Sequence, residues 1–91
     1  MQDGVKQSAT TRLSRIEGQI RGIARMIADD RYCIDVLNQI EAVKAALKKV
    51  QDEILRDHIG SCVEHAIVSG DRKDQRRKVA ELVQVLRHIT S

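Results

Sequence analysis

The chain has 91 residues, a formal net charge of +3, one aromatic residue and no proline. A chain of this length forms one small domain. With so few bulky side chains its hydrophobic core is small, so we expect a partner subunit to add stability. No segment approaches the roughly 20 apolar residues of a membrane span or the apolar core of a signal peptide, so we expect a cytoplasmic protein. No nucleophile, base and oxyanion-binding group can be combined into a catalytic site, so we do not expect an enzyme.

Residues 1–10 are predicted to be a flexible amino-terminal segment, followed by a single helical domain over 11–90. The first helix is expected over about 8–29, because the polar cluster from Ser8 to Thr11 supplies candidate N-caps. Apolar residues then follow at spacings of three and four, which is typical of one apolar helix face. They are Leu13, Ile16, Ile20, Ile23 and Ile27.

The second helix is expected over about 32–69, with Gly70 as its stop, and the third over about 71–89. Residues 32–69 would span about 57 Å as a helix, whereas a globule of this chain length has a radius of gyration of roughly 12 Å. The apolar stripe of the second helix would therefore be exposed in a monomer. We expect it to lie against another chain, in at least an antiparallel dimer.

Three potential metal ligands occur in and before the stretch "RDHIGSCVEHAI". His58 and Cys62 are four residues apart, so they share one face of a helix. Cys33 precedes His58 by 25 residues, about 37 Å along an unbroken helix, which is too far for a shared metal. If two such helices cross antiparallel near Ala46 and Leu47, Cys33 of one chain falls beside His58 and Cys62 of the other. Two equivalent sites follow by symmetry.

Two thiolates and one imidazole form a soft ligand set that suits Cu(I), whereas Zn(II) requires a fourth ligand. His65 follows Cys62 by three residues and could complete a zinc or nickel site. In the alternative interpretation, both cysteines are small core residues and His58 is an interior histidine.

No helix-turn-helix or zinc-finger pattern is present, so DNA binding has to be argued from the placement of charge. Arg12 and Arg15 lie on the first predicted helix, and Lys48 and Lys49 on the second. Such cations could contact DNA phosphates in a salt-sensitive way. Alternatively, they form solvated helix faces, and the third-helix cluster "RKDQRRK" serves solubility alone.

The stretch "RLSRIEGQIRGIARMIADDRYCIDVLNQIEAVKAAL", followed by "DHIGSCV", resembles the copper-sensing operon repressor (CsoR) family. The resemblance extends roughly from Thr11 to Leu86. It implies an all-α fold in which three-helix protomers form an antiparallel four-helix-bundle dimer and then a dimer of dimers.

The resemblance also implies roles for individual residues. Cys33, His58 and Cys62 match the metal ligands of the copper branch of the family. Tyr32 and Glu81 match residues beside that centre, where the glutamate is hydrogen-bonded to the histidine. Arg12 and Lys49 match the DNA-contacting surface.

Other branches of the family fit the sequence less well. The nickel and cobalt branch has an amino-terminal histidine, the formaldehyde branch has an amino-terminal proline, and the persulfide branch lacks the histidine that His58 matches. This chain has no histidine before His58 and no proline.

We therefore predict a repressor that binds double-stranded operator DNA as an apo tetramer and is released by Cu(I). The alternatives are a persulfide or thiol sensor using Cys33 and Cys62, a zinc or nickel sensor using His65, and a helical adaptor with no DNA role.

Overall fold

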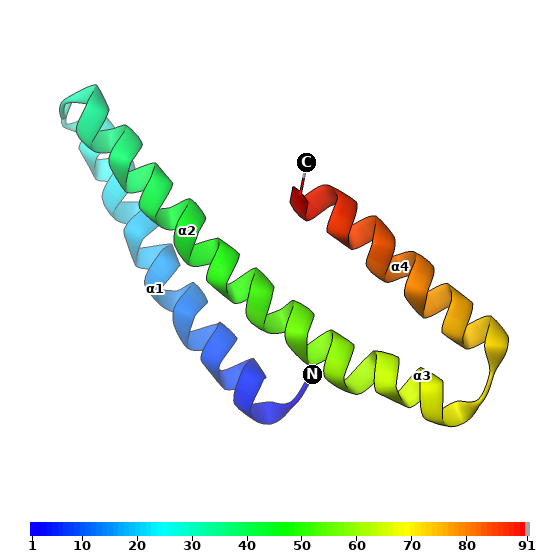
Figure 1. Cartoon of the computed structure of the whole chain (residues 1–91). Helices are drawn as coiled ribbons and strands as arrows, with labels where there is room; N and C mark the ends of the chain where they lie inside the picture. The colour runs from blue at the N-terminus through cyan, green and yellow to red at the C-terminus, as the bar shows by residue number, and fades with distance from the viewer. Residues whose placement is uncertain (91) are drawn as a thin grey trace. The chain divides into compact units, whose positions relative to one another are not determined.

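The computed structural model describes residues 1–90, except for the side chains of Cys62 and Thr90. Throughout that range the chain is helical apart from short connections, and no strand is present, so the predicted all-α class is confirmed. No helix within the described residues is both long and apolar enough to cross a membrane. The elements are α1 (Asp3–Ala28), α2 (Cys33–His58), the π-helix η1 (Ile59–Val63), α3 (Glu64–Ser69) and α4 (Arg72–Thr90) (Figure 1).

Helix α1 begins at Asp3, so the predicted start near residue 8 lies inside it, and residues 3–10 of the segment expected to be flexible are helical. Two of the three hydroxyl groups proposed as N-caps have other partners. Ser8 Oγ donates to the Glu53 carboxylate, and Thr10 Oγ1 donates to the backbone oxygen of Lys6 at 2.7 Å. The helix can start earlier because Asp3 places a negative charge in the first turn, where the helix dipole favours it.

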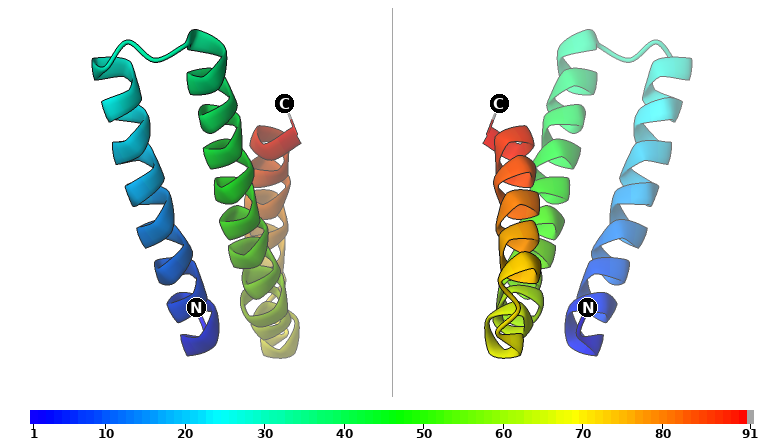
Figure 2. Two further views of the ribbon diagram at one scale, coloured as in Figure 1. Left: turned by 90° about the vertical axis from the view of Figure 1, so that its left-hand side faces the viewer. Right: turned by 90° about the vertical axis from the view of Figure 1, so that its right-hand side faces the viewer.

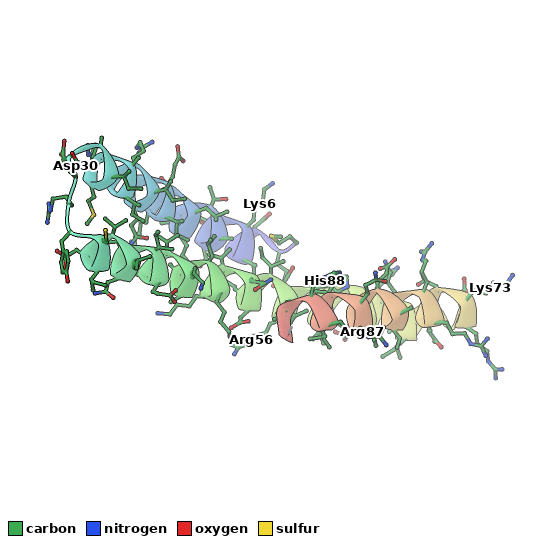
Figure 3. All side chains as sticks on the ribbon, turned by 90° about the horizontal axis from the view of Figure 1, so that it is seen from above. Lys6, Asp30, Arg56, Lys73, Arg87 and His88 are labelled. Carbon is green, nitrogen blue, oxygen red and sulfur yellow. The ribbon has the colours of Figure 1, made fainter. Side chains whose placement is uncertain are left out.

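A tight backbone motif ends α1. The Arg31 N–H donates to the Met26 oxygen at 2.9 Å, and the Asp30 N–H donates to the Ile27 oxygen at 3.2 Å. This is the bonding pattern of a Schellman motif, in which the residue after the cap is left-handed. Asp30 takes that position with φ of 54°, a conformation that aspartate tolerates better than most residues. Asp30 is labelled at this reversal in Figure 3.

The chain divides into two compact units, Met1–Leu55 and Arg56–Ser91. In the first unit, α2 returns alongside α1, and Figure 2 shows the two helices side by side, joined by the short connection. Their small core consists of Ala9, Ile16, Val43 and Val50, with Ile23, Ala46 and Ile54 packed against it. Within each helix the buried residues recur every seven positions, which is the repeat of a coiled-coil seam.

A second apolar row on each helix has no cover within the single chain. On α1, Leu13, Ile20 and Ile27 are 44%, 51% and 59% exposed and are also spaced by seven. On α2, Ile40 and Leu47 are 36% and 42% exposed. The helical hairpin therefore buries only part of the apolar stripe that the sequence encodes.

The predicted helix over 32–69 corresponds to α2, η1 and α3, which together run from Cys33 to Ser69. The difference from the prediction is η1, whose wider turn interrupts the α-helical repeat at Ile59–Val63. Gly70 ends this helical run with φ of 71°, which confirms it as the stop.

In the second unit, α4 follows the turn at Gly70 and begins at a capped end. Asp71 Oδ1 accepts hydrogen bonds from the backbone N–H groups of Lys73 at 2.9 Å and Asp74 at 3.3 Å. A carboxylate in this position satisfies N–H groups that the first turn of a helix leaves free. The side chain of Gln75 then ties α4 to α3 by donating to the backbone oxygen of the buried Ala66 at 3.4 Å.

Candidate metal centre and basic surface

Cys33 is the first residue of α2, and its thiol is free and exposed. Tyr32 lies immediately before it in the connection from α1, with 68% of its surface exposed. Both side chains are accessible to a second molecule because the core of the hairpin covers neither of them.

His58 is the last residue of α2 and is partly buried. Cys62 belongs to η1, and its side chain lies outside the described part of the structure. Ser61 Oγ donates to the backbone oxygen of Asp57 at 2.6 Å, one turn earlier. π-Helical turns inside α-helices occur frequently at functional sites, and here the turn contains the predicted ligand Cys62 and directly follows the predicted ligand His58.

Cys33 and His58 lie at opposite ends of the single α-helix α2. The 25 residues between them correspond to about 37 Å along the helix axis. Among the side chains that the structure describes, no group of three His, Cys, Asp or Glu residues could hold a metal ion. A centre that contains both Cys33 and His58 therefore requires two chains.

His65 and Glu81 are exposed on α3 and α4. Within the described part of the single chain, no hydrogen bond or ion pair joins Glu81 to His58. The roles of Glu81 beside the metal centre and of His65 as a further ligand stay predictions.

One face of α1 carries a shallow polar hollow. Its lining residues form two neighbouring rows in which successive residues are three or four positions apart: Gly4, Gln7, Ser8, Thr11, Arg12 and Arg15. Arg12 and Arg15 are the two cations of α1 that are predicted to bind DNA, and the hollow adds the neutral donors Gln7, Ser8 and Thr11 beside them. Gly4 and Gln7 belong to this helical face because α1 begins at Asp3, ahead of the predicted start near residue 8.

The four cations predicted to bind DNA differ in their partners. Arg12 Nε lies 3.7 Å from Glu53 Oε2, and Lys48 Nζ lies 3.2 Å from Asp52 Oδ2. Arg15 and Lys49 are exposed and have no carboxylate partner among the residues that the structure describes. The basic surface, defined here as Arg12, Arg15, Lys48 and Lys49, is therefore only half neutralised by its own chain.

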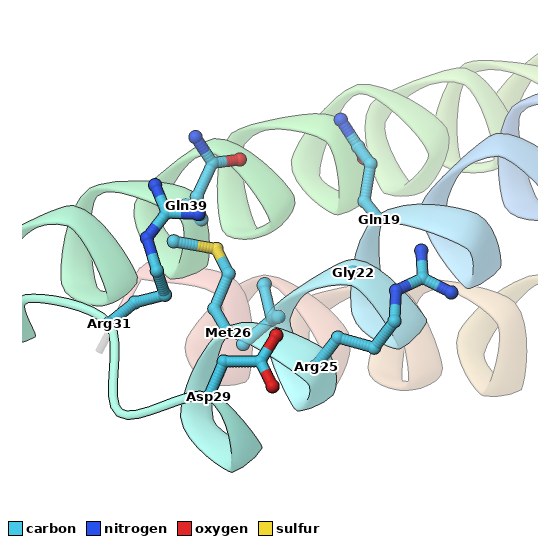
Figure 4. A pocket seen from close by; sticks show the side chains of 8 residues that line it. Gln19, Gly22, Arg25, Met26, Asp29, Arg31 and Gln39 are labelled. Atoms are coloured by element: carbon cyan, nitrogen blue, oxygen red, sulfur yellow. The ribbon is translucent and has the colours of Figure 1, made fainter.

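A second shallow hollow lies near the reversal between α1 and α2 (Figure 4). None of the predicted metal ligands lines it. It combines two arginines with one aspartate and several uncharged residues: Gln19, Gly22, Ile23, Arg25, Met26, Asp29, Arg31 and Gln39.

Comparison with known proteins gives consistent matches. A family model described as metal-sensitive transcriptional repressor matches residues 5–88. The copper-sensing transcriptional repressor CsoR of Bacillus subtilis strain 168 is 48% identical over 85 residues, covering 93% of this chain and 81% of the relative.

Two solved structures extend the comparison. The copper-sensing repressor CsoR with Cu(I) from Geobacillus thermodenitrificans NG80-2 matches with a TM-score of 0.89 and 37% identity, over 100% of this chain and 92% of the other. The nickel-responsive transcriptional regulator InrS matches with a TM-score of 0.75 and 40% identity, over 90% of this chain and 89% of the other.

Proposed function

Because the chain belongs to the family of metal-sensitive transcriptional repressors, we propose that it represses transcription by binding operator DNA without metal and releases the DNA on binding Cu(I). The observation that carries the proposal is the match, over the whole chain, to a repressor structure that contains Cu(I). The helix α2 also begins at a thiol, Cys33, and ends at an imidazole, His58, which supports the proposed ligand set.

Cu(I) would be held by Cys33 of one protomer and by His58 and Cys62 of its partner. When bound, Cu(I) would supply a soft cation that accepts donor electron pairs from the thiolates of Cys33 and Cys62 and from the imidazole of His58. Two thiolates and a neutral imidazole are donors that Cu(I) prefers. Glu81 would accept a hydrogen bond from the second imidazole nitrogen and so orient His58, while Tyr32 borders the thiol of Cys33.

The exposed apolar rows on α1 and α2 support an antiparallel dimer. A second copy of the hairpin would cover Leu13, Ile20 and Ile27 on α1 together with Ile40 and Leu47 on α2. Such a dimer also supplies the second chain that the metal centre requires. Two dimers would then form the tetramer that binds DNA.

The basic surface would hold DNA through its phosphates. The neutral donors of the hollow on α1, Gln7, Ser8 and Thr11, lie beside Arg12 and Arg15 and could add hydrogen bonds to phosphate oxygens. Contacts of this kind give an affinity that falls steeply with salt. For Cu(I) to release DNA, it must bind the weakly DNA-binding form more tightly, by a coupling free energy of typically about 1–3 kcal/mol.

The decisive experiment is an anaerobic Cu(I) titration of the reduced protein with a competing chelator, with DNA binding followed in the same samples. The DNA probe is a duplex selected from a random-sequence pool by the apo protein. We expect one tightly bound Cu(I) per chain and release of DNA in step with it.

Tight Cu(I) binding that leaves DNA affinity unchanged would contradict the proposal. Parallel titrations with Ni(II) and with a persulfide donor test the two alternatives within the family. The Ni(II) titration has a specific motive, because the nickel-responsive regulator InrS is 40% identical to this chain.

A further inference from the structure

Glu53 on α2 connects two residues of the polar hollow on α1. Its Oε2 atom accepts a hydrogen bond from Ser8 Oγ at 3.2 Å and lies 3.7 Å from Nε of Arg12. Ser8 and Arg12 are one helical turn apart, so their donors converge on the same carboxylate oxygen. Glu53 was not singled out by the sequence, because its partners lie 45 and 41 positions earlier in the chain.

The contacts that Glu53 makes are those that a DNA phosphate would make. Hydroxyl groups and guanidinium groups are regular partners of phosphate oxygens, and a carboxylate oxygen carries the same sign of charge. A phosphate that approaches Arg12 must therefore displace Glu53 or share its donors at the cost of repulsion. The side chains of Arg12 and Glu53 are 46% and 28% exposed, so the pair is held weakly enough to be broken.

We propose that Glu53 is an intramolecular competitor of DNA phosphate, which lowers the DNA affinity of the apo protein by occupying Ser8 and Arg12. This inference rests on the proposed function, because it assumes that Arg12 contacts DNA. Glu53 lies on α2, five residues before the predicted ligand His58. Its contacts therefore link the face of α1 that is proposed to bind DNA with the helix that carries the predicted ligands Cys33 and His58.

The test compares Glu53→Gln with the wild-type apo protein on the selected duplex across a range of salt concentrations. Glutamine keeps an acceptor for Ser8 but removes the charge that competes with phosphate. We expect Glu53→Gln to bind DNA about two- to fivefold more tightly for each Arg12 that binds a phosphate. This factor corresponds to the strength typical of a solvent-exposed ion pair, which the wild-type protein must break before Arg12 can bind DNA. The salt dependence should also become steeper: the slope of the logarithm of the DNA-binding constant against the logarithm of salt concentration should grow in magnitude by up to about 0.9 for each such phosphate. In the wild type, DNA binding frees the Glu53 carboxylate to take up a cation from solution, whereas the glutamine takes up none.

Two matched variants separate competition at Arg12 from other effects. Glu41→Gln makes the same charge change on α2, at a glutamate paired with Lys44, and should leave DNA affinity within about twofold of wild type because an exposed pair contributes little. In an Arg12→Ala background, Glu53→Gln should no longer increase the affinity. Thermal unfolding followed by circular dichroism checks that every variant is folded.

The inference fails if Glu53→Gln binds DNA no more tightly than wild type, if Glu41→Gln gains as much, or if the gain persists without Arg12. For a Glu53→Gln protein that does not fold, Glu53→Asp serves instead, because it withdraws the carboxylate by one methylene and should give a smaller gain in the same direction. If the wild-type apo protein binds no duplex at all, the proposed function itself is wrong.

Discussion

Arg12 and Arg15 lie on the same face of α1, yet they differ in whether a carboxylate of their own chain lies nearby. Arg12 is close to a carboxylate, whereas Arg15 has no such partner among the described residues. A cation without an internal partner gives up no ion pair when it binds a phosphate. If the proposed function holds, we expect Arg15 to contribute more to DNA binding than Arg12, which leads to a prediction at the scale of single residues.

Substitution Arg15→Ala should weaken apo-protein binding to the selected duplex by roughly tenfold at about 0.1 M salt for each phosphate that Arg15 binds, since one counterion fewer is released. The log–log salt slope should fall by about 0.9 for each of these phosphates. The control is Arg21→Ala, which removes the same charge from α1 at an arginine already paired with Glu17 at 3.2 Å. Equal reductions in affinity for both variants would mean that net charge alone governs DNA binding.

At the scale of elements, the helical run from Cys33 to Ser69 contains one π-helical segment, η1, and ends at a left-handed glycine. Gly60 lies within η1 and Gly70 at the stop. A Cβ atom added at either position would meet nothing within 4 Å. Only the backbone distinguishes them, because Gly70 has φ of 71°.

This difference predicts opposite effects on stability. Gly60→Ala should raise the free energy of unfolding by about 0.5–1 kcal/mol, because alanine reduces the entropy of the unfolded chain without a clash. Gly70→Ala should lower it by about 1–2 kcal/mol, since a Cβ disfavours the left-handed region. Chemical unfolding of the apo proteins at one fixed protein concentration measures both values. A decrease in the stability of Gly60→Ala would show that η1 itself requires glycine.

At the scale of the whole molecule, the exposed apolar rows on α1 and α2 favour packing against a second chain, and the proposed metal centre with both Cys33 and His58 would need one. Leu47, 42% exposed on α2, lies close to the expected crossing of the two helices. Substitution Leu47→Glu should weaken the dimer by well over tenfold, because each of two leucines forfeits a burial free energy of about 1.5–3 kcal/mol. Sedimentation velocity measures the change, and Gln51→Glu, at an exposed polar position on α2, is the control. An unchanged dimer would place the interface elsewhere.

A mixing experiment tests whether the metal centre is shared between protomers. Cys33→Ala chains and Cys62→Ala chains should each lack the tight Cu(I) site. When the two are unfolded and refolded together, each mixed dimer should regain one intact centre, because Cys33 comes from one chain and His58 with Cys62 from the other. Cu(I) titration against a chelator detects the recovered site. Absence of recovery would mean that the ligands do not cross the dimer interface.

The sequence alone determined the helical class, the positions of the apolar stripes, the stop at Gly70 and the candidate ligands Cys33, His58 and Cys62. These depend on local chemistry and helical spacing, which a sequence displays directly. The π-helical turn around Gly60 and the ion pair of Arg12 with Glu53 were decided by tertiary structure. For the ion pair the physical reason is that packing α1 against α2 brings the Ser8 hydroxyl and the Arg12 guanidinium to a carboxylate more than 40 residues away.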